Sequence, residues 1–366
     1  MNQFPKDSLF DLEIMTDDVT VLKPRTRLLY GDWILELKRG KTLFALNINW
    51  EQIDPTEFYD TYVFSFHVEQ WNNEWLKKFC VEHSDSQIVI ISEFPLDRTT
   101  DSFYQDVYNL KCLVYHCWGV LLDEVLTFDD TIYVPTEFRH CRLSSLVNKP
   151  SYFKALVTAH VMMNHGHRKD MILSWNINDR QEICPSLRFL NERDSRPALA
   201  ALIKFYHETL QDLSIRLGEF NDSRLSNYYG NIPAYTDCLV NSTNETYARS
   251  SIFPGPFITE KTWKPLMTGC ALLPQGPSGI YPYLENFGFV FDYPWDRSYD
   301  LIDGDIDRFL QYLKTLDQLF EIEFDELANK LAHSSRYNYD HIRSTAFKSR
   351  IHDLNQRSLN EFLQTY

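Results

Sequence analysis

The chain has 366 residues, of which 44% are hydrophobic and 24% are charged. This composition can bury a core, excludes an intrinsically disordered chain, and fits two domains of ordinary size. The formal net charge of −15 argues against a protein that coats nucleic acid through a uniformly basic surface.

Short segments rich in β-branched or aromatic residues alternate with helix-like segments in the first half. The alternation of strand and helix predicts βαβ units on a parallel sheet. The predicted strands are Leu43–Ile48, Thr61–Val68, Gln87–Ser92 and Cys112–His116, and the predicted helices are Asn73–Glu82 and Val120–Leu126.

A second series of the same kind begins near residue 150, and a periodic helical pattern follows it. Strands are predicted at Met171–Trp175, Asp237–Asn241, Cys270–Pro274 and Phe289–Asp292, and a helix is predicted at Pro197–Leu213. The fold class is therefore α/β, with two Rossmann-like domains facing a cleft and a helical C-terminal tail. We expect an N-terminal domain at 1–148, a second domain at 149–330, and a helical tail at 331–366 that packs back on the first domain.

No segment has the pattern of a membrane span or a secretion signal. The seven cysteines are scattered without a CxxC pair, which is typical of reduced thiols. We therefore expect a cytoplasmic protein with no membrane partner.

The segment from Phe257 to Gly269 combines charged and capping residues at the start of a predicted helix. A helix N-terminus offers backbone N–H groups and a partial positive charge, which suit a diphosphate. A capped surface helix with solvated lysines is the alternative. Thr259 or Thr262 would cap the helix, and Lys261 and Lys264 would add positive charge at its start. Glu260 would accept hydrogen bonds from ligand hydroxyl groups. Gly276 and Gly279 would let a second loop approach the site closely.

This segment, together with Leu284-x-x-x-Gly-Phe289, resembles the donor-binding region of a phage and bacterial glycosyltransferase family with a TEK-x-x-KP motif. It is more loosely similar to the α-1,3-fucosyltransferases. The stretch from Asp237 to Thr246 resembles the strand that precedes this motif, and it places Glu245 on the neighbouring loop. This chain departs from the family pattern at Thr268-Gly-Cys270, where a smaller apolar pair is expected. We expect this difference to affect packing more than chemistry.

The resemblance implies the GT-B arrangement, with an acceptor-side first domain and a nucleotide-sugar-binding second domain. It also implies a metal-independent glycosyltransferase, a hexosyl- or pentosyltransferase, that uses a nucleotide-sugar donor and no cofactor. Lys261 would face the diphosphate, Thr259 would help to seat it, and Glu260 would hold ribose or sugar hydroxyls. The acceptor is a glycan, a small molecule or a hydroxymethylated base in phage DNA, and the chain is a monomer or homodimer. If the protein is phage-encoded, it acts in the host cytoplasm. A non-catalytic nucleotide- or sugar-binding protein on the same scaffold is the alternative.

Candidates for the catalytic base end the predicted strands of the first domain. His67 and Glu69 end one strand and Glu93 ends the next, where catalytic groups lie in α/β sheets. An inverting transfer needs one base to take the acceptor proton. A retaining transfer does not need it, and polar strand ends bound to backbone are the alternative.

Residues 137–169 contain six basic residues and one acidic residue, a net charge of +5 in an acidic chain. Such a strip could attract phosphate or a nucleic-acid backbone, or it could be a solvated helix face. The candidate residues are Arg139, Arg142, Lys149 and Lys154. His165-Gly-His167 lacks a third ligand in the sequence, and Asp303-Gly-Asp305 fits a helix start, so no metal site is expected.

Overall fold

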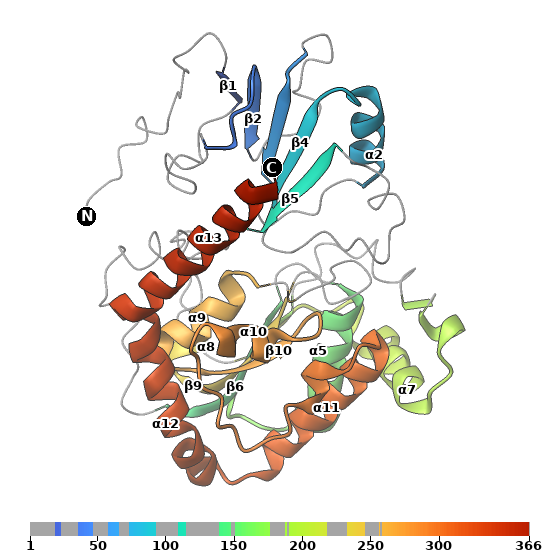
Figure 1. Cartoon of the computed structure of the whole chain (residues 1–366). Coiled ribbons are helices and arrows are strands. Elements are labelled where there is room, and N and C mark those ends of the chain that lie inside the picture. Colours follow the sequence, from blue (N-terminus) through green and yellow to red (C-terminus); the bar gives the residue numbers. More distant parts are fainter. Residues whose placement is uncertain are drawn as a thin grey trace, which may run out of the picture. The chain divides into compact units, whose positions relative to one another are not determined.

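The computed structural model describes residues 19–22, 36–46, 58–65, 73–92, 109–114, 139–147, 151–175, 187–188, 190–217, 233–245, 256 and 258–365. The chain divides into two compact units, one comprising 1–125 with 348–366 and the other 126–347. Each unit has its own sheet, which confirms an α/β fold with two parallel sheets and C-terminal helices (Figure 1). The domain boundary expected at 148/149 falls inside the second unit, because the strand that precedes it pairs with the second sheet.

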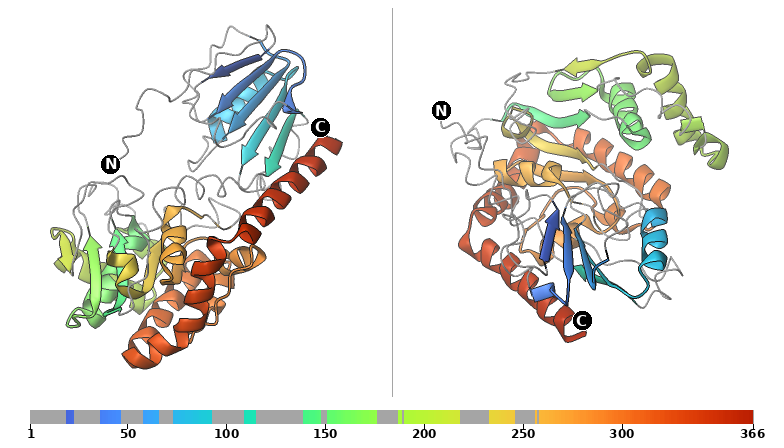
Figure 2. Two further views of the ribbon diagram at one scale, coloured as in Figure 1. Left: turned by 90° about the vertical axis from the view of Figure 1, so that its left-hand side faces the viewer. Right: turned by 90° about the horizontal axis from the view of Figure 1, so that it is seen from above.

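The first unit is built on a five-stranded sheet in the order β1-β2-β3-β4-β5, and every neighbouring pair is parallel. In Figure 2 these strands lie side by side in one layer, coloured blue to cyan. The strands are β1 (Val19–Leu22), β2 (Thr42–Leu46), β3 (Thr61–Ser65), β4 (Gln87–Ser92) and β5 (Leu110–Val114). The predicted helix Val120–Leu126 lies outside the described residues.

An aromatic cluster forms the core of this unit between the sheet and α2 (Asn73–Glu82). Tyr62 and Phe64 of β3 are fully buried, and Phe79 of α2 meets both rings edge-on at centroid distances of 5.0 and 5.2 Å. Alternation along β3 places these two side chains on the same face of the sheet, and α2 covers that face.

The second unit contains a sheet in the order β10-β9-β6-β7-β8, in which only β8 is antiparallel among the described strands. Its central strands are buried on both faces, which is typical of a parallel sheet covered by helices on both sides. The strands are β6 (Cys141–Val147), β7 (Met171–Trp175), β8 (Ile215–Leu217), β9 (Cys238–Asn244) and β10 (Ala271–Gln275).

The strand order of this sheet reverses at β6. The chain passes from β6 to β7 on one side and later returns to place β9 and β10 on the other side of β6. A reversal of this kind is a topological switch point, and ligands bind there at the carboxyl ends of the strands.

A helix begins after the carboxyl end of each of the strands β6, β9 and β10. The helices and helical turns are α5 (Tyr152–His165), α7 (Pro197–Phe205) with a π-turn at Tyr206–Leu210, α8 (Pro233–Thr236), α9 (Glu260–Thr268), α10 (Ile280–Asn286), a 3₁₀ turn at Ser298–Leu301, α11 (Asp305–Glu321) and α12 (Phe324–Ile342). The last helix, α13 (Thr345–Thr365), starts in the second unit, and from Lys348 onward it belongs to the first. None of the helices in the described ranges is both long and apolar enough to cross a bilayer.

The segment predicted as a strand at Phe289–Asp292 has no regular secondary structure and pairs with no described strand. The side chain of Asn338 on α12 replaces the missing strand, because it bonds the N–H of Val290 at 2.8 Å and its carbonyl at 2.7 Å. Ser334 Oγ, also on α12, accepts a hydrogen bond from the N–H of Asp292 at 3.0 Å. The strand prediction is therefore wrong in its pairing, although the burial of Phe289 and Phe291 follows the expected alternation.

Candidate active site at the carboxyl edge of the second sheet

Two parts of the predicted donor site meet at the ends of two neighbouring strands. Glu245 directly follows β9, and Gly276 directly follows β10. The two strands pair in parallel with Asn244 opposite Gln275, and the N–H of Glu245 donates to the Gln275 carbonyl at 3.0 Å. Segments about 30 residues apart in the sequence therefore form one edge beside the switch point.

Glu245 is fully buried, and its carboxylate fixes the start of α9. Its Oε1 accepts the N–H of Thr259 at 3.1 Å and the hydroxyl of Thr262 at 2.6 Å, and its Oε2 accepts the hydroxyl of Thr259 at 2.6 Å. A carboxylate at a helix N-terminus is stabilised by the helix dipole and by charge-assisted hydrogen bonds. Glu245 therefore takes the place at this helix end that the sequence analysis gave to a diphosphate.

Thr259 is the N-cap of α9, as predicted. Its Oγ1 accepts the N–H of Lys261 at 3.3 Å and the Nζ of the same lysine at 3.2 Å. The ammonium group of the half-buried Lys261 is thus held over the Glu245–Thr259 pair. Lys264, one turn further along α9, is buried. Glu260 is the first residue of α9, and its side chain lies outside the described positions.

The glycine turn after β10 lies close to Glu245. A Cβ atom on Gly276 would lie 2.7 Å from Cδ1 of Ile280 and 3.5 Å from Cβ of Glu245, so a side chain there would collide. Gly279 has a φ of +87°, a conformation that favours glycine. The buried Arg308 donates its Nε–H to the Gly276 carbonyl at 3.0 Å, which fixes the turn.

Asp300 occupies the start of α10 in the same way that Glu245 occupies the start of α9. Its Oδ2 accepts the N–H of Tyr281 at 2.7 Å. Burial raises the pKa of Asp300 to about 6, against the opposing effect of backbone hydrogen bonds from Tyr281 and Ile280. Both helices that follow β9 and β10 therefore already carry a buried protein carboxylate at their N-termini.

The start of α5, at the carboxyl end of β6, is different. Its N-cap residue Ser151 makes no side-chain cap hydrogen bond among the described residues, and its first turn contains no acidic side chain. Lys154 lies in that first turn and is buried. Lys149 precedes the helix but lies outside the described residues. Of the basic strip, Lys154 is thus the residue that the structure places beside the switch point.

Arg139 and Arg142 lie at the amino edge of the same sheet, opposite to the motif. Arg139 donates to the carbonyl groups of Tyr235 at 2.7 Å and Thr268 at 2.5 Å, and it also contacts that of Cys238. Arg142 is buried, bonds Asp170 at 3.1 Å and closes the end of α11 through the Leu319 carbonyl at 2.9 Å. These contacts give both guanidinium groups a structural role at some distance from the candidate site.

Two buried acceptors at the carboxyl edge were missed by sequence reasoning. Asn244 Oδ1 and Gln275 Oε1 have no hydrogen-bond partner in the described part of the chain, although both side chains are at most 4% exposed. The orientation of the Asn244 amide is fixed, because its Nδ2 donates to Ser145 Oγ and to the Ser242 carbonyl, both at 3.2 Å. A buried acceptor without a donor is costly, and a ligand hydroxyl or N–H is one explanation for it.

The three candidates for the catalytic base, His67, Glu69 and Glu93, lie outside the described residues. Their roles remain predictions.

Comparisons with known proteins find a distant likeness to a solved structure. No family model matches the sequence, and no curated protein matches it. The chain is similar to the crystal structure of a glycosyltransferase from Rickettsia africae ESF-5, with 14% sequence identity and a TM-score of 0.41. The similarity covers 91% of this chain and 79% of that one. A likeness at this level does not by itself assign an activity.

Proposed function

We propose that the protein is a glycosyltransferase that moves a sugar from a nucleotide-sugar donor to a hydroxyl acceptor. The observation that carries this proposal is the meeting of the motif residues around Glu245, Lys261 and Gly276 at the carboxyl ends of β9 and β10. This edge adjoins the switch point between β6 and β9, where parallel α/β sheets bind nucleotides.

The charge of the donor diphosphate would be met mainly by cations and by one helix start. Lys261 holds its ammonium group at this edge, and α5 begins there without an acidic residue in its first turn. The starts of α9 and α10 are already neutralised by Glu245 and Asp300, so they contribute position rather than charge. In this proposal Glu245 is a positioning residue that acts on the donor through Thr259 and Lys261.

The hydroxyl groups of the sugar or ribose would donate hydrogen bonds to two buried side-chain oxygens. Asn244 Oδ1 and Gln275 Oε1 can each accept one donated hydrogen bond, as Glu260 was expected to do. The glycine turn leaves open space at Gly279, where an added Cβ atom would meet nothing within 4 Å, so a ligand can approach the backbone closely there. His67, Glu69 and Glu93 remain the proposed sources of a base for an inverting transfer.

The experiment is a thermal-shift and calorimetry screen of the full chain against a panel of nucleotide sugars. We expect one nucleotide sugar to bind, and Lys261→Ala to weaken that binding about 10- to 100-fold through loss of a charge-assisted contact. Lys330→Ala is the matched control, since Lys330 is an exposed lysine of α12 in the same unit. Failure of every nucleotide sugar to bind would overturn the proposal.

Transfer is tested with the best donor in the presence of glycan and small hydroxylated acceptors. Release of nucleoside diphosphate together with a glycosylated product is the expected result. Tight donor binding that never yields a product would instead assign the chain as a non-catalytic nucleotide- or sugar-binding protein.

A further inference from the structure

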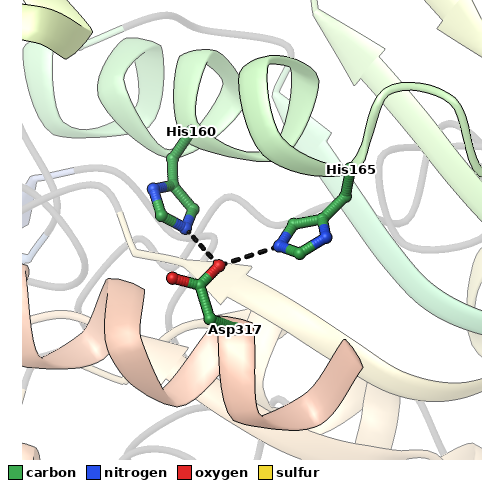
Figure 3. Close-up of side chains that lie close together, drawn as sticks. All are labelled: His160, His165 and Asp317. Atoms are coloured by element: carbon green, nitrogen blue, oxygen red, sulfur yellow. Dashed lines mark hydrogen bonds and ion pairs between the residues drawn. The ribbon is translucent and has the colours of Figure 1, made fainter. Parts of the chain in front are cut away.

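Three metal-ligating side chains converge at the far end of α5 from the candidate active site. His160 and His165 lie in the last turns of α5, and Asp317 faces them from α11 (Figure 3). The Nε2 atom of each histidine is 2.8 Å from the same oxygen, Oδ1 of Asp317. The three ligand atoms lie within 4.8 Å of one another.

The packing of the two helices fixes these side chains in place. Phe153 of α5 meets Phe309 of α11 at a centroid distance of 4.7 Å, so the helices are already in contact further along. The His165 ring stacks on Phe320 at 3.9 Å, and Phe320 lies one turn beyond Asp317. His160 is buried and His165 is largely buried. The imidazoles are therefore preorganised, as a metal site requires.

The donor set suits a divalent transition ion better than an alkaline-earth ion. Two imidazole nitrogens and one carboxylate oxygen are ligands that zinc uses, whereas Mg²⁺ and Ca²⁺ prefer oxygen alone. Metal–ligand distances of about 2.0 Å in a tetrahedron separate the ligand atoms by roughly 3.3 Å. The two nitrogen–oxygen separations of 2.8 Å need to widen slightly, and the two Nε2 atoms lie within 4.8 Å of each other. Asp317 is 41% exposed, which leaves a side open for a water molecule as the fourth ligand.

Asn164 provides the outer partner that a metal-bound histidine needs. When Nε2 of His160 binds an ion, the ring proton is on Nδ1 and requires an acceptor. Asn164 lies one turn along α5 with its amide 3.2 Å from that Nδ1. Rotation of the amide by half a turn presents its oxygen instead of its nitrogen, so Asn164 can serve both the ion-free and the ion-bound cluster.

We propose that His160, His165 and Asp317 form a binding site for a divalent transition ion of the zinc class, which ties α5 to α11. The motif His165-Gly-His167 contains no third ligand. The structure instead pairs His165 with His160, five residues earlier on the same helix, and takes the third ligand from more than 150 residues away. His167 is exposed and is not part of the cluster.

The test is zinc binding to the chelator-treated full chain, measured by calorimetry with ZnCl₂ and by thermal shift. We expect zinc to bind the parent and to raise its melting temperature, and MgCl₂ to do neither. Asp317→Asn and His165→Gln should each weaken zinc binding by more than tenfold, and Asn164→Ala by about tenfold. His167→Gln is the matched control and should bind zinc like the parent.

Circular dichroism checks that each variant folds. If His165→Gln does not fold, Asp317→Asn gives the same test, because it replaces a partly exposed side chain by one of equal size. Absence of zinc binding to the parent would overturn the proposal, and so would equal zinc affinity in the parent and Asp317→Asn. In either of those cases the cluster is a hydrogen-bonded contact between two helices. The result is independent of the nucleotide-sugar experiments.

Discussion

Glu245 is a single buried carboxylate that organises the start of α9 through three short hydrogen bonds with Thr259 and Thr262. The cap residues could be identified from the local capping pattern, whereas Glu245 was proposed only through the family resemblance. Sequence reasoning could not foresee that the carboxylate reaches across 14 residues to occupy the helix end, since this depends on the pairing of β9 with β10.

We predict that Glu245→Ala lowers the free energy of unfolding by about 3 kcal/mol, because two threonine hydroxyls and one N–H lose a charged acceptor in a buried site. Glu245→Gln should cost less, since the hydroxyl groups can turn to accept from its amide. Denaturant unfolding measures both. Glu192→Ala, at an exposed position, should stay within about 0.5 kcal/mol of the parent. Equal stability of Glu245→Ala and Glu192→Ala would contradict the prediction.

Asp300 predicts a pH-dependent difference in stability. Its folded-state pKa of about 6 lies above the ordinary value of 3.8, so the folded state holds the proton more tightly than the unfolded state. The stability that this carboxyl contributes is therefore lost as pH rises from about 4 to about 6. The unfolding free energy of Asp300→Asn minus that of the parent should increase over this window, by at most about 3 kcal/mol.

Denaturant unfolding at several pH values between 4 and 7 measures this difference. Asp212→Asn, at an exposed turn position in the same unit, is the matched control. A difference for Asp300→Asn that is flat or decreases with pH would refute the assignment.

At the scale of elements, the predictions succeed where periodicity is strong and fail where tertiary partners decide the structure. The helix Asn73–Glu82 and the strands Gln87–Ser92 and Met171–Trp175 have the predicted bounds. The strand β6 was missed because its apolar residues are interrupted by Ser144 and Ser145. Both serines are buried and accept hydrogen bonds from asparagines of β9, so their polarity is satisfied inside the sheet.

In the segment Phe289–Asp292, the side chain of Asn338 bonds the backbone where a neighbouring strand would otherwise do so. Asn338→Ala leaves both the N–H and the carbonyl of Val290 without these partners, and should cost about 2 kcal/mol. Asn338→Asp keeps the acceptor for the Val290 N–H but buries a carboxylate with its second oxygen against the Val290 carbonyl, so it should cost at least as much as Asn338→Ala. Denaturant unfolding measures these values, with Asn329→Ala at an exposed position of α12 as the control. Loss of stability in the control alone, or in neither variant, would contradict this account.

At the scale of the whole molecule, the alternation of strands and helices predicted two α/β units, and both sheets are present. The sequence does not reveal the order of the strands, because pairing is set by contacts between distant segments. The strand order places the candidate site, because it brings β6 beside β9. The basic strip is divided between the two edges of this sheet. Lys154 lies at the carboxyl edge, while Arg139 and Arg142 lie at the amino edge, bound to carbonyl groups.

This division of the basic strip bears on the choice of acceptor. Binding to duplex DNA requires several cations that can face phosphates together, and its affinity falls steeply with salt. Arg139 and Arg142 are engaged with the protein backbone, and the chain as a whole carries a net charge of −15. We therefore predict no measurable binding to a hydroxymethylated duplex at low salt, by fluorescence anisotropy. An unmodified duplex of the same sequence is the control. Salt-dependent binding that is stronger for the modified duplex would contradict the prediction and favour a DNA base as the acceptor.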